Sequence, residues 1–393
     1  MSRTAWTWGA AILAALLLAA GPSVLSEYYM HIAITAFFYA ILASSWTLLA
    51  GYAGQFSFGH MAFMAIGAYG TGLLGKYFRL TSAPTQTCTE FSLGNYWLVI
   101  LNPTGVTSSS INCLEIAKET LPQGTVIISP PVWLGLIVGA IMGALFGLLV
   151  GALVLRLRST YLALFTIGFS EIIRAILSAE ISITEGQSGL ELVPLFPGGL
   201  DIFGFSFSSS DKIPPYYVML ALFLLSMALM SWLAASRFGL FIRAIREDEE
   251  AAAALGVNIV RYKILVFVIT STIAAAAGAV QAHYIGIITP NILIILQMSL
   301  VISMAVIGGL ESIVGAAIGA IILQFALELL RSSFSIGPIE VDMSVWRLVF
   351  FGMLLMVTLR FQRNGLIAPI IDRLTRGNVA AETVAKRKAA VET

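Results

Sequence analysis

The residues that could carry out chemistry are few, and their spacing fits no catalytic or metal site. The run 70–76 imitates the glycine and lysine spacing of a phosphate-binding loop, but Tyr77 stands where that loop needs Ser or Thr, and no strand-like run precedes it. The three histidines, His31, His60 and His283, have no His, Asp or Glu at ligand spacing. Neither a Gly-x-Ser-x-Gly nor a His-Glu-x-x-His pattern occurs. We therefore predict no catalytic residue and no nucleotide, metal or cofactor site on this chain, which is not expected to be an enzyme.

Five polar side chains inside apolar runs are the candidates for contact with a solute: Gln55, Ser57, His60, Glu171 and Arg174. Glu171 and Arg174 are spaced i, i+3, so they can pair on one helix face, and charges at membrane depth usually face the bundle interior or water. A structural ion pair is the favoured interpretation, and a lining for a zwitterionic solute is the alternative. The other three lie in a glycine-rich stretch that would let the backbone line a cavity or break the helix. Packing and capping explain those glycines about as well.

The composition sets the class of protein that must position these residues. Of the 393 residues, 58% are hydrophobic and 11% are charged, against ~45–50% and ~25% in soluble domains. The net charge of +1 argues against a basic nucleic-acid binder. We predict an all-α integral membrane protein with about ten transmembrane helices, some of them broken or re-entrant.

The apolar runs and the basic residues together predict a topology. The runs are 6–25, 29–50, 56–78, 132–155, 161–178, 216–235, 263–288, 292–309, 313–331 and 345–360. The runs 161–178 and 292–309 are the weak ones. With Arg3 inside, most of the 22 Lys and Arg residues fall on the inner side, as the positive-inside rule requires. We expect the protein to lie in a bacterial inner membrane, with both termini on the cytoplasmic side. The transmembrane domain is predicted over 1–378 and a polar basic tail over 379–393. A cleaved signal peptide is the alternative for the first run.

The segment 79–131 is expected to be a polar insertion on the outer side. It contains both cysteines of the chain, Cys88 and Cys113. In an oxidising periplasm these would form a disulfide, and two free thiols are the alternative.

A row of glycines marks the run 132–155. The row consists of Gly135, Gly139, Gly143, Gly147 and Gly151, each four residues after the last, so all lie on one face of a helix. Small residues at this spacing let a second helix approach closely in a membrane. We predict a tight helix–helix interface here, with a groove for solute as the less favoured interpretation.

The longest inner loop before the tail spans 236–262 and holds an acidic run followed by alanines. Acidic residues suit a helix N-terminus, alanines extend the helix and Gly256 can end it, which predicts a short amphipathic helix on the cytoplasmic face. Glu250-Ala251-Ala252 followed at the right distance by Gly256 resembles the loop by which importer-type ABC permeases dock on their ATP-binding subunits. Glu247, Glu250, Ala251, Ala252 and Gly256 are accordingly the predicted coupling residues.

Longer stretches extend this resemblance. GYAGQFSFGHMAFMAIGAYG, SRFGLFIRAIREDEEAAAALGVNIVRYK, AHYIGIITP and VIGGLESIVGAAIGA are similar to the LivM-type permease subunits of branched-chain amino-acid ABC importers. The resemblance implies a heterodimer with a second, related permease, two ATP-binding subunits and a periplasmic solute-binding protein. It also implies contact with membrane lipid and none with nucleic acid. Two features depart from the family: the long insertion, and residues 184–189, where the family usually shows a Thr-Gly-Gly opening.

The resemblance favours one function and leaves two alternatives. It implies a permease subunit for branched-chain or other hydrophobic amino acids that performs no chemistry itself. A permease for urea or short amides, and an ion-coupled secondary transporter, remain the alternatives.

Overall fold

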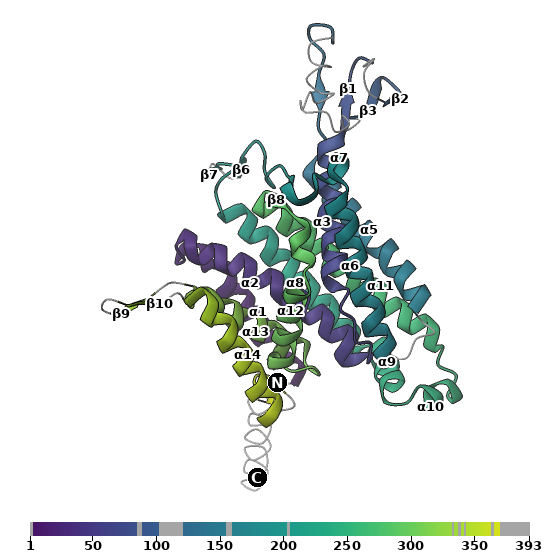
Figure 1. The fold of residues 1–393 in the computed structure, drawn as a ribbon, viewed down its shortest axis with the longest axis vertical. Helices are drawn as coiled ribbons and strands as arrows, with labels where there is room; N and C mark the ends of the chain where they lie inside the picture. Colours follow the sequence, from purple (N-terminus) through teal and green to yellow (C-terminus); the bar gives the residue numbers. More distant parts are fainter. Residues whose placement is uncertain are drawn as a thin grey trace, which may run out of the picture. The chain divides into compact units, whose positions relative to one another are not determined.

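The computed structural model describes residues 3–84, 89–101, 121–154, 159–202, 205–331, 334–336, 339–341, 343–362 and 365–369, and its described residues are mostly helical (Figure 1). The long helices are α1 (Arg3–Ala19), α2 (Glu27–Trp46), α3 (His60–Tyr77), α5 (Val132–Val154), α6 (Ser159–Ala179), α8 (Ile213–Ala235), α11 (Ile259–Ile285), α12 (Ile295–Gly308), α13 (Ile313–Leu329) and α14 (Met343–Phe361). Each of the predicted apolar runs therefore overlaps one of these long helices.

Within the described residues, five helical segments are long and apolar enough to cross a membrane. They are 27–52, which joins α2 to the π-helix η2 (Thr47–Tyr52), and 132–153, 161–179, 213–235 and 259–285. The pair α12 and α13 passes the same test together and is bent by 119°, so the described residues hold up to six spans if this pair is counted as one broken or re-entrant span. The bend lies at residues 309–312, after the run 292–309, which itself contains the continuous helix α12, and 161–178 lies in the single continuous helix α6. The ten crossings remain a prediction.

The chain divides into two compact units, and the second is built around α3, α5 and α11. It comprises Gln55–Asp211 and Gly256–Met298. The predicted glycine face of α5 is buried along its whole length. Gly139 lies against the Gly67 carbonyl of α3, and Gly151 lies against Phe267 of α11. The row is therefore the interface at which α5 packs on two helices at once, and its contacts run antiparallel to both.

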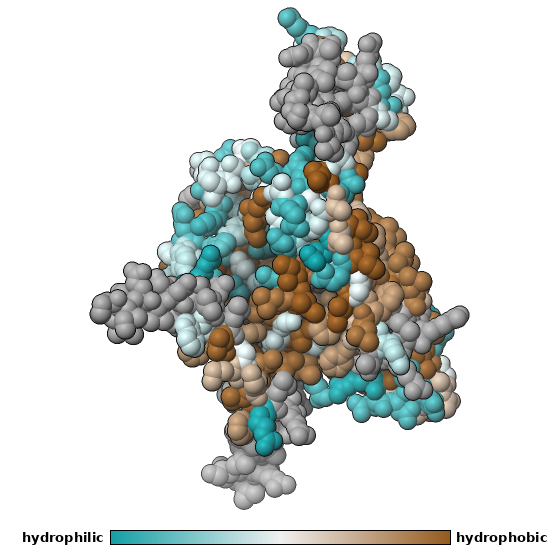
Figure 2. Space-filling view, viewed as in Figure 1, coloured by the Kyte–Doolittle hydropathy of each residue, from teal (hydrophilic) through white to brown (hydrophobic). Residues whose placement is uncertain are grey.

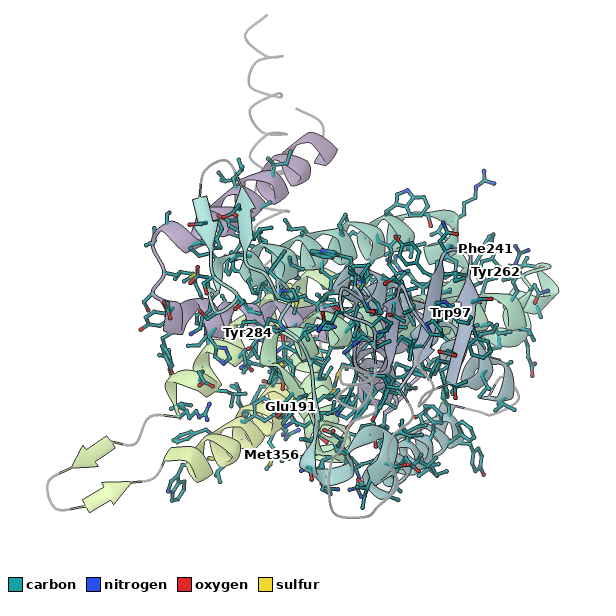
Figure 3. The ribbon with its side chains drawn as sticks, turned by 90° about the horizontal axis from the view of Figure 1, so that it is seen from above. Trp97, Glu191, Phe241, Tyr262, Tyr284 and Met356 are labelled. Atoms are coloured by element: carbon teal, nitrogen blue, oxygen red, sulfur yellow. The ribbon has the colours of Figure 1, made fainter. Side chains whose placement is uncertain are left out.

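Part of the insertion 79–131 folds, together with Phe78, as a small antiparallel sheet, where the sequence suggested only a polar loop. Its strands are β1 (Phe78–Thr81), β2 (Thr89–Leu93), β3 (Tyr96–Ile100) and β4 (Ile127–Ile128), in the order β2-β3-β1-β4. β1 continues directly from α3 and pairs with β3 in the register Phe78↔Ile100. The alternation in Tyr96-Trp97-Leu98-Val99-Ile100 buries Val99, and Trp97 is visible on this strand (Figure 3). Both cysteines lie outside the described residues.

Short elements complete the second unit. They are α7 (Ile181–Thr184), η3 (Gly186–Ser188), β5 (Leu190–Glu191), β6 (Leu200–Ile202), β7 (Phe205–Phe207), β8 (Ile287–Ile288) and η4 (Pro290–Leu293). β5 pairs antiparallel with β8, so Leu190 faces Ile288 across the pair. The departure at 184–189 falls on α7, η3 and the turn between them, where Glu185 has a positive φ of 61° and forms an ion pair with Lys76 of α3.

The first unit is built around α2, which is buried almost completely. It comprises Met1–Gly54, Lys212–Leu255 and Ser299–Thr393. α2 packs against α8 and α13, and Ser44 of α2 donates a hydrogen bond to the Ile313 carbonyl at 3.1 Å. The glycines of the stretch 51–60 do break the helix, because α2 ends in the π-helix η2 and Gly54 follows with a φ of +68°. This unit also holds η1 (Gly21–Ser23), α9 (Arg237–Glu247), α10 (Glu249–Ala254), β9 (Phe334–Ile336) and β10 (Ile339–Val341).

Candidate functional site: the α9–α10 segment and buried polar residues

The segment 236–262 contains the two helices α9 and α10 ahead of α11, instead of the single short helix that its sequence suggested. α9 buries Gly239, Ile242 and Ile245, which recur every three residues along one face. Asp248 then adopts an extended conformation, with φ −155° and ψ 110°, and breaks the helix. Its carboxylate accepts a hydrogen bond from the Ala251 amide at 3.0 Å, which makes it the N-cap of α10. The acidic run thus caps a helix as predicted, except that Glu247 belongs to the last turn of α9.

The exposed face of α10 is small, acidic at its start and apolar at its end. Glu249, Glu250, Ala251, Ala253 and Ala254 are exposed, and Leu255, which follows the helix, is 84% exposed. Figure 2 shows hydrophilic residues over α10 and apolar residues over much of the long helices.

One predicted coupling residue is placed differently. Ala252 is only 2% exposed, so its methyl group packs inside the chain, and the prediction that it belongs to the partner-facing surface is wrong. Gly256 fits its predicted role, because its φ of +83° is a conformation that favours glycine and it follows the last helical residues directly.

Two arginines of α9 connect this segment to the rest of the first unit. Arg246 donates hydrogen bonds to the Gly51 carbonyl of η2 and, at 2.7 Å, to the Glu311 carboxylate between α12 and α13. Arg243 lies 4.5 Å from the ring centroid of Tyr52, and the Tyr52 hydroxyl donates to the Glu311 carbonyl at 2.9 Å. These contacts could not be predicted from spacing, because they join residues that lie far apart along the chain.

The second unit places the predicted ion pair as the spacing indicates. The Arg174 guanidinium contacts the Glu171 carboxylate through two nitrogens, each at 2.8 Å. Both side chains remain partly exposed on the surface of α6, at 33% and 42%. Whether they line a path for solute remains a prediction.

Gln55, Ser57 and His60 are all buried where the chain enters α3. The Ser57 hydroxyl accepts a hydrogen bond from the Gly59 amide at 3.1 Å, which fixes the turn that leads into α3. The Gln55 side-chain oxygen and both ring nitrogens of His60 have no hydrogen-bond partner among the described residues. Buried polar atoms of this kind usually find a partner in water or a ligand. A role along the solute path therefore remains open to Gln55 and His60.

Three further buried polar residues lie on α3 and α11. Tyr69 and Gln281 each carry a buried oxygen without a partner in the described part of the chain. His283 instead bridges two elements: its Nδ1 contacts the Val193 carbonyl at 2.7 Å, and its Nε2 contacts the Thr71 hydroxyl at 2.8 Å. A carbonyl can only accept, so Nδ1 carries the proton and Thr71 donates to Nε2. His283 therefore joins α11 to α3 through Thr71. Among the described residues no cluster of three or more metal-ligating side chains occurs.

These features define a multi-pass helical membrane protein with an exposed, polar helical segment outside its spans. The family described as "Branched-chain amino acid transport system / permease component" matches residues 28–359, and the chain belongs to this family.

Individual relatives agree with that membership. The chain is 30% identical to the high-affinity branched-chain amino acid transport system permease protein LivM of Escherichia coli over 359 residues, which cover 86% of this chain and 73% of the relative. It is 26% identical to the probable branched-chain amino acid transport permease protein LivM of Methanocaldococcus jannaschii over 350 residues, 85% and 92% of the two chains. It is also 37% identical to the permease protein LivH of Escherichia coli over 156 residues, 39% of this chain and 50% of LivH. No solved structure matches the chain.

Proposed function

We propose that the chain is one of two permease subunits in an ABC importer that carries branched-chain or other hydrophobic amino acids across a bacterial inner membrane. The LivM and LivH relatives are permease proteins of high-affinity branched-chain amino acid transport systems, which supports an amino-acid substrate over urea or short amides. The second permease is a related, LivH-like chain. Two ATP-binding subunits on the cytoplasmic side hydrolyse ATP, and a periplasmic protein delivers the solute.

The observation that carries this proposal is the α10 segment. A helix that exposes Glu249, Glu250 and three alanines cannot lie in lipid. We infer that in a permease this exposed surface binds a partner protein. Its small side chains allow a partner groove to approach closely, and Leu255 supplies an exposed apolar anchor at its end. ATP-driven change in the partner then shifts the permease between outward-open and inward-open forms, to the extent that the partner binds one form better.

The direction of the helices in the second unit supports the proposed topology of ten crossings with both termini inside. α5 packs antiparallel to both α3 and α11, so the N-terminal ends of α3 and α11 lie on the same side of the second unit. The basic residues Arg261 and Lys263 open α11 at that side. The β1–β4 sheet follows the other end of α3. Basic residues at one end and a polar sheet at the other fit cytoplasm and periplasm.

The test is co-purification of the ATP-binding subunits with single variants of the permease pair, together with uptake. Leu255→Asp replaces an apolar anchor with a charge that the proposed groove cannot pair, so recovery of the ATP-binding subunits and uptake should both fall. Val126→Asp is the matched control, because Val126 is also an exposed apolar residue, at 58%, and lies beside the β1–β4 sheet. If Leu255→Asp recovers ATP-binding subunits as well as the control does, α10 is not the coupling element.

A further inference from the structure

The contacts of α9 converge on a single turn of the backbone. Residues 309–312 connect α12 to α13 at the 119° bend, and Gly309 has a φ of +118°. The backbone of Gly51 in η2 lies directly against the Leu310 carbonyl of this turn, at a distance that leaves no room for a side chain. From the far end of the chain, the Leu366 amide donates to the Ile307 carbonyl at 2.8 Å. The end of α2, the bend of α12–α13 and the segment after α14 therefore meet at one place.

Arg246 is the side chain that joins α9 to this meeting point. The final carbonyls of a helix lack partners within the helix, and a cation at that end is favoured by the helix dipole. At the end of η2, Arg246 supplies both a hydrogen-bond donor to the Gly51 carbonyl and a positive charge. Its second hydrogen bond goes to the Glu311 carboxylate. Gly54 packs against the arginine stem, since a Cβ there would lie 3.2 Å from the Arg246 Cγ. The planar guanidinium can satisfy two acceptors in fixed directions, which a lysine cannot do.

These contacts contribute little to the folding of the unit. The Glu311 side chain is 74% exposed and the Arg246 side chain 32%, and an ion pair in such surroundings stabilises a protein only slightly. The first unit is held together instead by the burial of α2 against α8 and α13. Because the fold depends little on these contacts, the reach of Arg246 to both Gly51 and Glu311 is better explained by another role.

We propose that Arg246 is a positioning residue that transmits displacement of the α9–α10 segment to the end of α2 and the α12–α13 turn. The inference rests on the proposed function, since it requires that α10 receive the motion of an ATP-binding partner. α9 and α10 contact each other and are separated by the single residue Asp248, so a push on α10 reaches α9 directly. Arg246 and the stacked pair Arg243–Tyr52 then pass it to Gly51 and Glu311. The broken span is the element that changes between the two transport states.

The test measures solute taken up per ATP hydrolysed by the complete transporter in proteoliposomes. Arg246→Gln and Glu311→Ala should each lower this ratio by about tenfold, within the range of typical coupling between sites. The double variant should be no worse than the more severe single variant, because both changes break the same link. Arg237→Gln is the matched control, since it removes one exposed positive charge from the same helix and so controls for an effect on topology.

The outcomes are separable from failure of the proposed function. If the parent transporter shows no ATP-dependent uptake, the proposed function fails. If the parent transports and both single variants keep its ratio, or the double variant shows the product of two independent losses, the transmission role of Arg246 is refuted. Should Arg246→Gln lose its ATP-binding subunits during purification, Glu311→Ala decides, because that exposed side chain can be truncated without disturbing packing. Glu311→Gln should then retain most of the parent ratio, because its amide oxygen still accepts from Arg246.

Discussion

Adding one methyl group to the glycine row of α5 should have opposite consequences at its middle and at its end. At Gly139 a Cβ would lie 2.6 Å from the Gly67 carbonyl oxygen and 3.3 Å from the Ala279 Cβ. The nearest obstacle is backbone and cannot rotate away, so α5 must move off α3. At Gly151 the nearest atoms, in Phe267 and Ile264, are 3.5 and 3.8 Å away, which is ordinary contact.

The magnitudes follow from these distances. Overpacking a well-packed interface costs about 1–3 kcal/mol, so Gly139→Ala should lower the stability of the protein by that amount. Gly151→Ala meets no obstacle and gains helix propensity, so its stability should stay within about 1 kcal/mol of the parent or rise. The measurement is the midpoint of thermal aggregation of purified protein in detergent, followed by size-exclusion chromatography. Equal midpoints for Gly139→Ala and the parent would refute the close-packing account, and so would equal losses for the two alanine variants.

Three further predictions concern pairs of side chains. Thr71→Val should lower stability by about 1–3 kcal/mol, because it leaves Nε2 of the buried His283 without a hydrogen-bond donor. Thermal midpoints of Thr71→Val and Thr71→Ser will check this, and equal losses for the two variants would argue against the bond. Cys88 and Cys113 should label with a thiol reagent only after reduction, in protein taken from cells with an oxidising periplasm; equal labelling before and after reduction would contradict a disulfide. Glu171→Gln should harm uptake more than the double change to Gln at Glu171 and Met at Arg174, because the single change strands the arginine. Losses in the double variant that equal the sum of the two singles would show that the pair is uncoupled.

Sequence reasoning succeeded where the physical cause is local. Five glycines at a spacing of four must share a helix face, so the packing row of α5 could be predicted, and so could the Glu171–Arg174 pair. The order of acidic residues, alanines and Gly256 likewise predicted a helix on the inner loop. The same local rules do not say which residue of a short helix turns inward, and Ala252 was therefore misplaced.

The missed features depend on distant parts of the chain. Arg246 finds Gly51 and Glu311 only because the fold brings α9, η2 and the α12–α13 turn together, and no spacing along the chain encodes that. The sheet of the outer insertion was missed for a different reason. Its strands are short and surrounded by polar residues, although the run Tyr96-Trp97-Leu98-Val99-Ile100 carries the aromatic and β-branched side chains that favour a strand.

Residues 184–189, where the sequence departs from the family, have a defined local structure. Residues 184–189 form a turn with one non-glycine residue at positive φ, Glu185, and its carboxylate is neutralised by Lys76. The strain at such a residue is retained only where surrounding contacts fix it. The ion pair and the hydrogen bond from the Tyr77 hydroxyl to the Ile183 carbonyl at 2.9 Å supply those contacts. These contacts hold residues 184–189 in one local structure, in place of the Thr-Gly-Gly opening that the family resemblance leads one to expect.

Uptake by the reconstituted transporter is the direct test of whether this chain is a permease subunit of an ATP-driven amino-acid importer. Vesicles should contain this chain, its LivH-like partner and the ATP-binding subunits, with the binding protein and a radiolabelled branched-chain amino acid added outside. We expect accumulation that requires ATP inside the vesicles and disappears when the ATP-binding subunits are left out. Accumulation by this chain alone, driven by a proton or sodium gradient and indifferent to ATP, would contradict it.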